Sequence, residues 1–266
     1  MKTKKSLGQH FLNSAKIIQE IVDVSDIKNT DTILEIGPGE GILTSALILT
    51  GANILSIEKD DRLIPLLEEK FSKEISSGKL KIIHKDILEL EIDKIIGPYK
   101  VVANIPYYIT GQIIRMFLDS NNQPESMTLL VQKEVAERIV AKEGKESLLS
   151  LSVKIFGTPK YIKTVGKNHF KPQPNVDSAI LLISNISKNN FPKDSPWGKW
   201  VGMSKKLFFE IIHAGFAHKR KQLLPNLSSL YNKEKLIEIF EKCNINQKVR
   251  AEDVHLETWI EICKIM

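Results

Sequence analysis

Cysteine is scarce in this chain of 266 residues, with two in all, Cys243 and Cys263. Neither stands at a spacing typical of metal ligands, so we expect no metal site, no disulfide framework and a reducing compartment, the cytoplasm. Long hydrophobic runs are absent too, because polar residues interrupt the longest uncharged stretch, residues 41–57, and we therefore expect no membrane span. No apolar segment follows the lysines at the N-terminus, so we expect no signal peptide.

The composition that remains is typical of a folded protein, with 42% hydrophobic and 26% charged residues. The net charge is +6 and it is uneven, because residues 186–266 hold 14 basic and nine acidic residues. Residues 147–176 contain lysines and no acid, as do residues 1–19, and a further cluster stands at 219–221. Such clusters attract a polyanion. Charge alone is equally compatible with a solvated surface, and it does not distinguish RNA from DNA or an anionic membrane.

Strand and helix patterns alternate through the first two thirds of the chain, which predicts an α/β fold with a parallel sheet covered on both faces. Strands are expected at Thr32–Ile36, Asn53–Ile57, Leu80–Ile83, Lys100–Ala103 and Met127–Val131, and helices at Gly41–Leu49, Arg62–Phe71, Gly111–Leu118, Glu134–Val140 and Leu148–Phe156. Tyr161–Val165 and Ser178–Ile183 follow with no helix pattern between them, which predicts an antiparallel hairpin at the sheet edge.

The character of the chain changes after Ser184, where Asn, Ser, Pro and Asp residues predict a loop-rich boundary. Beyond it, apolar residues recur at helical spacing around Leu207, Leu236 and Leu256. We therefore predict two domains, an α/β domain at 1–189 and a small all-helical domain at 190–266.

Polar or glycine residues follow several of the predicted strands, and ligands of open parallel sheets bind at the carboxyl ends of the strands. The glycines of Gly37-Pro38-Gly39 allow a sharp turn and the close approach of a ligand. Glu58 is placed to accept the two hydroxyls of a ribose, and Asp86 to accept an exocyclic adenine amine. Together they favour a cofactor that carries adenosine, either a nicotinamide dinucleotide or S-adenosylmethionine. Singly, each is also compatible with a tight turn or a helix cap.

The segment Asn104-Ile105-Pro106-Tyr107 after the fourth strand favours a methyltransferase that acts on a base. The adenine amine is a poor nucleophile, and an acceptor such as the Asn104 side-chain oxygen would orient it toward a methyl donor. Tyr107 offers a face on which a flipped-out base can stack. Asn104 is neutral, so the pattern does not predict strong general-base chemistry. The alternative is a loop bent by proline around a buried tyrosine.

These residues belong to a larger set of ordered motifs, which resembles the ribosomal RNA adenine-N6 dimethyltransferases, and most closely the small-subunit type. The matching segments are Gly8–Leu12, Glu35–Gly39, Asn104–Tyr107, Gln132–Arg138, Phe170–Ser178, Ala214–Phe216 and Arg250–Glu252.

The resemblance implies a class I (Rossmann-like) methyltransferase sheet and a helical domain that contacts RNA. It implies that the enzyme uses S-adenosylmethionine, without a metal, to dimethylate two adjacent adenosines near the 3′ end of 16S rRNA in the small ribosomal subunit. We expect the protein to be a monomer. The cofactor contacts that the resemblance implies are His10, Leu12, Gly37, Glu58, Asp86 and Asn104. The catalytic residues that it implies are Asn104, Pro106, Tyr107 and Phe170. Among these, Phe170 is implied to be the second aromatic wall for the target base. His10 and Tyr108 depart from the family pattern, since Asn is common at both positions.

Two other functions stay open at this point. One is the drug-resistance type that dimethylates a 23S rRNA adenosine, against which the Gly37-Pro38-Gly39 loop and Arg250-Ala251-Glu252 favour the small-subunit type. The other is a ribosome-assembly factor that acts chiefly by binding an immature small subunit.

The basic clusters predict that RNA affinity falls steeply with salt, because each neutralised phosphate releases counterions. We expect the dissociation constant for ribosomal RNA to rise about tenfold or more between 50 and 200 mM KCl, measured by filter binding. A flat salt dependence over this range would contradict the assignment of these clusters to RNA.

Overall fold

The computed structural model describes the chain in five segments, residues 9–95, 97–141, 144–188, 203–218 and 220–266. By their contacts the residues group into two compact units, 1–136 with 157–187, and 137–156 with 188–266. The predicted domain boundary between 189 and 190 lies outside the described residues, as do Gly8 and Lys219. Residues 137–156, expected in the first domain, lie in the second unit.

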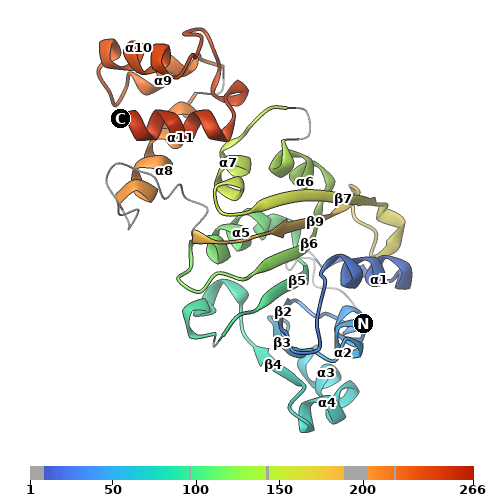
Figure 1. Ribbon diagram of the computed structural model, residues 1–266. Helices are drawn as coiled ribbons and strands as arrows, with labels where there is room; N and C mark the ends of the chain where they lie inside the picture. Colours follow the sequence, from blue (N-terminus) through green and yellow to red (C-terminus); the bar gives the residue numbers. More distant parts are fainter. Residues whose placement is uncertain (1–8, 96, 142–143, 189–202, 219) are drawn as a thin grey trace. The chain divides into compact units, whose positions relative to one another are not determined.

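The first unit is built on a seven-stranded sheet, which confirms the predicted α/β class (Figure 1). Its strands lie side by side in the order β4 (Leu80–His84), β3 (Asn53–Glu58), β2 (Thr32–Ile36), β5 (Lys100–Asn104), β6 (Ser126–Gln132), β9 (Ser178–Ser184) and β7 (Thr158–Val165). The first five pair in parallel, and β9 is antiparallel to both β6 and β7. The predicted hairpin is therefore confirmed, with β7 as the edge strand.

Helices cover this sheet. Successive strand residues point to opposite faces of the sheet, so apolar side chains on a strand are buried by helices packed against those faces. Alternate residues such as Ile33, Val102 and Ile180 belong to one buried cluster, which also takes residues from α1 and α2. The helices of this unit are α1 (Ala15–Val24), α2 (Ile42–Leu49), α3 (Ile64–Lys70), α4 (Ser72–Ser76) and α5 (Thr110–Asp119). In α5, Phe117 is fully buried and its ring lies 6.4 Å from that of Tyr99.

A second, two-stranded sheet was not predicted. The strand β1 (Phe11–Leu12) pairs antiparallel with β8 (Phe170–Lys171), two segments far apart in the sequence. The backbone N–H of Asn13 extends the pairing by donating to the carbonyl of His169 at 2.9 Å. We call residues 9–13 the strap, because this pairing ties the start of the described chain to the loop before β9.

The second unit is helical, as predicted for the C-terminal part of the chain. Its helices are α7 (Leu148–Lys154), α8 (Met203–Gly215), α9 (Leu223–Leu227), α10 (Lys233–Lys242) and α11 (Leu256–Ile265), and α6 (Lys133–Val140) runs across the division between the units. Its core holds Phe208, Phe240 and Trp259, each fully buried, and the indole N–H of Trp259 donates to the carbonyl of Val254 at 3.0 Å.

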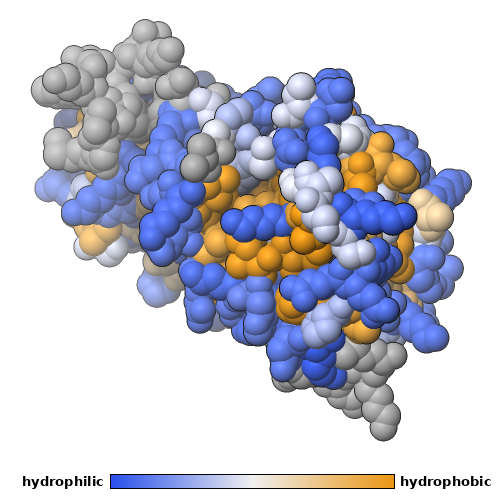
Figure 2. Space-filling model, turned by 90° about the horizontal axis from the view of Figure 1, so that it is seen from below, coloured by the Kyte–Doolittle hydropathy of each residue, from blue (hydrophilic) through white to orange (hydrophobic). Residues whose placement is uncertain are grey.

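Apolar residues at the surface are few among the described residues. On the face shown in Figure 2, hydrophilic residues surround a central apolar area, and smaller apolar areas lie toward the edges. Among the described large apolar or aromatic residues, Tyr108 is the second most exposed, at 62%, after Leu49. No helix in the described part of the chain is long and apolar enough to cross a membrane.

Glu35 is a carboxyl group buried completely inside the first unit. Its Oε2 accepts hydrogen bonds from the hydroxyls of Thr44, at 2.8 Å, and Ser56, at 2.7 Å, whereas its Oε1 has no partner among the described residues. Burial raises the pKa of Glu35 to about 7, against the partly opposing hydrogen bonds. The folded protein therefore binds a proton at Glu35 more tightly than the unfolded chain does.

This linkage predicts a stability that falls as the pH rises from about 4.5 to about 7, where the folded carboxyl loses its proton. Glu35→Gln removes this titrating group, so the variant should not lose stability for this reason as the pH rises. The difference in the free energy of unfolding, variant minus wild type, should therefore increase by up to about 3 kcal/mol over this range. Urea unfolding at pH 5, 6, 7 and 8 measures the difference, with Glu69→Gln on the exposed side of α3 as the control. A difference that stays constant with pH would show that Glu35 titrates at its ordinary pKa.

Candidate functional site

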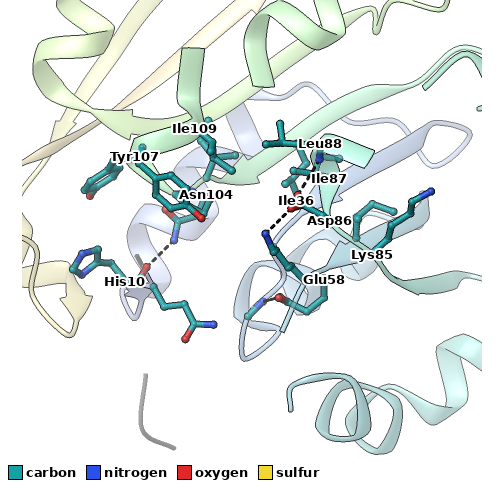
Figure 3. Close-up of a pocket in the computed structure, with 18 of the residues that line it drawn as sticks. His10, Ile36, Glu58, Lys85, Asp86, Ile87, Leu88, Asn104, Tyr107 and Ile109 are labelled. Carbon is teal, nitrogen blue, oxygen red and sulfur yellow. Dashed lines mark hydrogen bonds and ion pairs between the residues drawn. The ribbon is translucent and has the colours of Figure 1, made fainter. Parts of the chain in front are cut away.

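A pocket lies at the carboxyl ends of β2, β3, β4 and β5, the edge at which the sequence predicted a ligand site. Strap residues form a further part of its wall (Figure 3). The structure brings together most of the predicted site residues here: His10, Gly37, Glu58, Asp86, Asn104, Pro106 and Tyr107 all line the pocket. Tyr108, a residue that differs from the Asn common in the family, lines the pocket too.

Two predicted site residues do not line this pocket. Leu12 borders a smaller pocket that shares Phe11, Gly37 and Asn104 with the first. Phe170 is 4% exposed, pairs with Leu12 across β1 and β8, and belongs to the buried core cluster. The structure therefore places Phe170 beneath the strap and away from the pocket wall.

The carboxylate of Glu58 is held by backbone groups at the end of β3. Its Oε2 accepts the N–H of Gly39 at 3.1 Å, and its Oε1 accepts the N–H of Asp60 at 2.7 Å. Burial raises the pKa of Glu58, and these hydrogen bonds oppose the rise. Each carboxylate oxygen keeps acceptor capacity beyond one backbone bond, so Glu58 is able to take the hydroxyls of a ribose.

Asp86 follows β4 and forms an ion pair at the pocket. Its Oδ2 lies 2.5 Å from Nζ of Lys59, and its Oδ1 accepts the N–H of Leu88 at 3.0 Å. Partial burial alone would raise the pKa of Asp86, but the hydrogen bonds from Lys59 and Leu88 outweigh it and the pKa is lowered. Asp86 is therefore a charged acceptor at neutral pH, with Ile87 and Leu88 beside it as apolar lining.

The glycine loop and the strap fit closely against each other. Gly37 and Gly39 have φ angles of +66° and +60°, a region that favours glycine. A Cβ on Gly37 would meet no atom within 4 Å, whereas one on Gly39 would lie 2.8 Å from Cε1 of Phe11. Gly37 thus leaves open space for a ligand, and Gly39 leaves space for the strap.

Asn104 and Tyr107 stand between the strap and β9. The Asn104 side chain donates from Nδ2 to the carbonyl of His10 at 3.0 Å, and this leaves its Oδ1 as an acceptor. The Tyr107 hydroxyl lies 2.6 Å from Oγ of Ser178, and its ring stacks with that of His10 at a centroid distance of 5.9 Å. Burial raises the pKa of Tyr107, so its hydroxyl is protonated at neutral pH.

Several contacts at the site were missed by sequence reasoning. Ser178, at the end of the Phe170–Ser178 motif, holds the Tyr107 hydroxyl, and Gln9 donates from Nε2 to Oδ2 of Asp60 at 2.9 Å. The position of Ser178 inside a matched motif was the one signal that pointed to it. Among the described residues, no group of three or more His, Cys, Asp or Glu side chains is placed to hold a metal ion.

Comparison with known proteins adds three findings. The whole chain, residues 1–266, matches the family described as ribosomal RNA adenine dimethylase. It is 39% identical over 99% of its length to ribosomal RNA small subunit methyltransferase A of Dehalococcoides mccartyi, covering 88% of that protein. It is 40% identical over 99% of its length to the protein of the same name from Fusobacterium nucleatum, covering 97% of it.

Two solved structures share the fold at a TM-score of 0.78. One is the 23S rRNA methyltransferase ErmE, at 24% identity over 96% of this chain and 98% of the other. The other is a dimethyladenosine transferase from Plasmodium falciparum, at 22% identity over 95% of this chain and 96% of the other. Both support the class I methyltransferase fold that the motifs implied.

The fit between the strap and the glycine loop predicts unequal effects of two similar substitutions. Gly37→Ala and Gly39→Ala each force a residue with a Cβ into the left-handed region, at roughly 1–2 kcal/mol. Gly39→Ala should lower the free energy of unfolding by about 1 kcal/mol more, because Phe11 must move away. Urea unfolding of both variants measures this, and Phe11→Ala in the Gly39→Ala chain should remove the excess. Equal losses in the two single variants would show that Phe11 does not press on Gly39.

Proposed function

The chain belongs to the ribosomal RNA adenine dimethylase family, and from this membership we propose that it dimethylates the N6 amines of two adjacent adenosines near the 3′ end of 16S rRNA. The substrate is the small ribosomal subunit or its precursor, and the protein acts as a monomer in the cytoplasm. The observation that carries the proposal is that Asn104 and Tyr107 line the same pocket as Glu58 and Asp86. The names of the two relatives with about 40% identity support the small subunit as the target.

The residues present fit S-adenosylmethionine. Glu58 offers carboxylate acceptors for the ribose hydroxyls, and Asp86 offers one for the adenine amine. Gly37 leaves the loop open to a ligand, and Ile57, Ile87 and other apolar residues line the pocket on this side. The cofactor, when bound, supplies an electrophilic methyl group. The strap forms the other side of the pocket through Gln9, His10 and Phe11, and Leu12 borders the smaller pocket beside it.

Asn104 is the group that orients the target amine. Because its Nδ2 is committed to the carbonyl of His10, its Oδ1 is the acceptor for an N6 hydrogen of adenine. This hydrogen bond draws the lone pair of the nitrogen out of the ring and aims it at the methyl carbon, which is catalysis by orientation. Asn104 takes no proton, so the proton released after methylation passes to water.

Tyr107 is the stacking surface for the target adenine. Pro106 shapes the turn that presents it, and Ser178 holds its hydroxyl at 2.6 Å. Stacking on an aromatic side chain holds a base that has left its helix. We propose that Phe170, buried under the strap, acts through β8 by supporting Leu12.

Mass spectrometry of ribosomal RNA tests the function. Purified protein is incubated with S-adenosylmethionine and under-methylated 30S particles, and two adjacent N6,N6-dimethyladenosines near the 3′ end of 16S rRNA are expected. Modification of 50S particles or of naked 23S rRNA instead would establish the drug-resistance type. Tight binding of 30S particles without methylation of any RNA would establish an assembly factor.

Asn104→Ala separates catalysis from binding in the same assay. Loss of the orienting acceptor should lower the rate of methylation about 100-fold or more, while the affinity for 30S particles stays within about twofold of wild type. Asn53→Ala, an exposed asparagine at the opposite end of the sheet, is the matched control and should methylate normally. Loss of subunit binding in a folded Asn104→Ala protein that still binds the cofactor would contradict separable roles.

A further inference from the structure

The side chain of Asp60 is fully buried behind the pocket wall, two positions after Glu58. A buried carboxylate is costly unless donors surround it. Arg62 supplies three of them: its Nε and its backbone N–H donate to Oδ1 at 2.9 and 3.2 Å, and its Nη2 donates to Oδ2 at 2.6 Å. The charge of Asp60 is therefore neutralised within one short segment of the chain.

A further donor to Asp60 comes from the strap. Nε2 of Gln9 donates to Oδ2 of Asp60 at 2.9 Å, and Gln9 itself lines the pocket. A hydrogen bond to a charged acceptor is about twice as strong as one between neutral groups. Because Arg62 stays on the carboxylate when Gln9 leaves, the strap is able to detach here without leaving an unpaired buried charge.

The backbone of Asp60 serves the opposite wall of the pocket. Its N–H donates to Oε1 of Glu58 at 2.7 Å, and Glu58 is the carboxylate that fits the ribose. In Figure 3, Glu58 and His10, the strap residue next to Gln9, lie on different sides of the pocket. The two walls between which the cofactor fits are thus joined at Asp60, one by its backbone and the other by its side chain.

The strap has few other attachments among the described residues. Its strand β1 pairs with β8 over two residues, and the N–H of Asn13 adds one hydrogen bond to this pairing. A segment held by so few bonds opens locally while the rest of the fold stays intact. Each methyl transfer consumes one donor molecule, so dimethylation of one adenosine requires that the cofactor be exchanged between the two transfers.

We propose that Asp60 is a positioning residue of the cofactor pocket, which holds Glu58 by its backbone and latches the strap by its side chain through Gln9. Release of the Gln9–Asp60 contact then frees the strap wall, and the cofactor is exchanged while Glu58 and the Asp60–Arg62 pair stay in place. This inference rests on the proposed function for the identity of the cofactor.

Gln9→Met tests the latch on the full chain, because methionine keeps the length of the side chain and has no N–H to donate. In the free protein, hydrogen exchange of the strap amides, among them the Asn13 N–H, should become about tenfold faster, the scale of one hydrogen bond to a charged group. Dissociation of radiolabelled S-adenosylmethionine, followed after a chase with unlabelled compound, should become faster by a similar factor. Gln19→Met is the matched control, since Gln19 donates to Asp23 at 2.8 Å on the exposed side of α1, and both rates should stay within about twofold of wild type.

Asp60→Asn supplies the second arm of the experiment. It removes the charge that Gln9 contacts but keeps the backbone N–H that holds Glu58. In this background Gln9→Met should change either rate by less than about twofold, because the contact is already weakened. A further tenfold change would show that Gln9 acts without Asp60 and would overturn the inference.

The two rates together distinguish a latch from a direct contact. Faster cofactor release in Gln9→Met, with unchanged exchange of the strap in the free protein, would overturn the inference in favour of a direct contact between Gln9 and the cofactor. Faster strap exchange with unchanged release, or no change in either rate, would show that this contact does not control the cofactor. Failure of the wild-type protein to bind S-adenosylmethionine would instead count against the proposed function, and strap exchange in the free protein would still test the Gln9–Asp60 contact.

Discussion

Parallel pairing of β2, β3, β4 and β5 is the constraint on which the site depends. Because the four strands run in one direction, their carboxyl ends meet at one edge of the sheet, and the residues that follow them share one pocket. Gly37, Glu58, Asp86 and Asn104 come from four separate segments, and the common direction of the strands brings them to one edge. The direction and order of the strands therefore determine where the functional groups of the site lie. The segments after the strands determine which side chains are present there.

The strap completes the pocket by a different kind of interaction. It is fixed by a few specific contacts to segments far away in the sequence: two paired residues of β8, the carbonyls of His169 and Pro172, and the amide of Asn104. Short strands held this way open at a low free-energy cost compared with the central sheet.

The sequence predictions were accurate where a structure depends on residues close together in the sequence, and they failed where it depends on distant residues. Strand and helix periodicity is local, so the sheet, the antiparallel hairpin and the residues at the strand ends were predicted. The β1–β8 pairing was not, because two residues have no periodicity and their partners are more than 150 positions apart. The same limit explains Phe170, whose ring lies in the core. A motif names the residue, but whether its ring enters the core or faces the pocket depends on which strand pairs with it.

The two ends of the pocket carry different kinds of side chain, and this difference fits the proposed reaction. At one end, Glu58 and Asp86 are carboxylates held by backbone N–H groups, and Asp86 is paired with Lys59. At the other, Asn104 and the protonated Tyr107 carry no charge, and Tyr107 is hydrogen-bonded to Ser178. A neutral amine that attacks a cationic methyl donor needs no base to become reactive, but it does need its lone pair aimed. In the function that we propose, hydrogen-bonding and stacking groups supply that aim, and they carry no charge that would have to be neutralised when the base enters. Orientation is therefore the contribution that we propose for this end of the pocket.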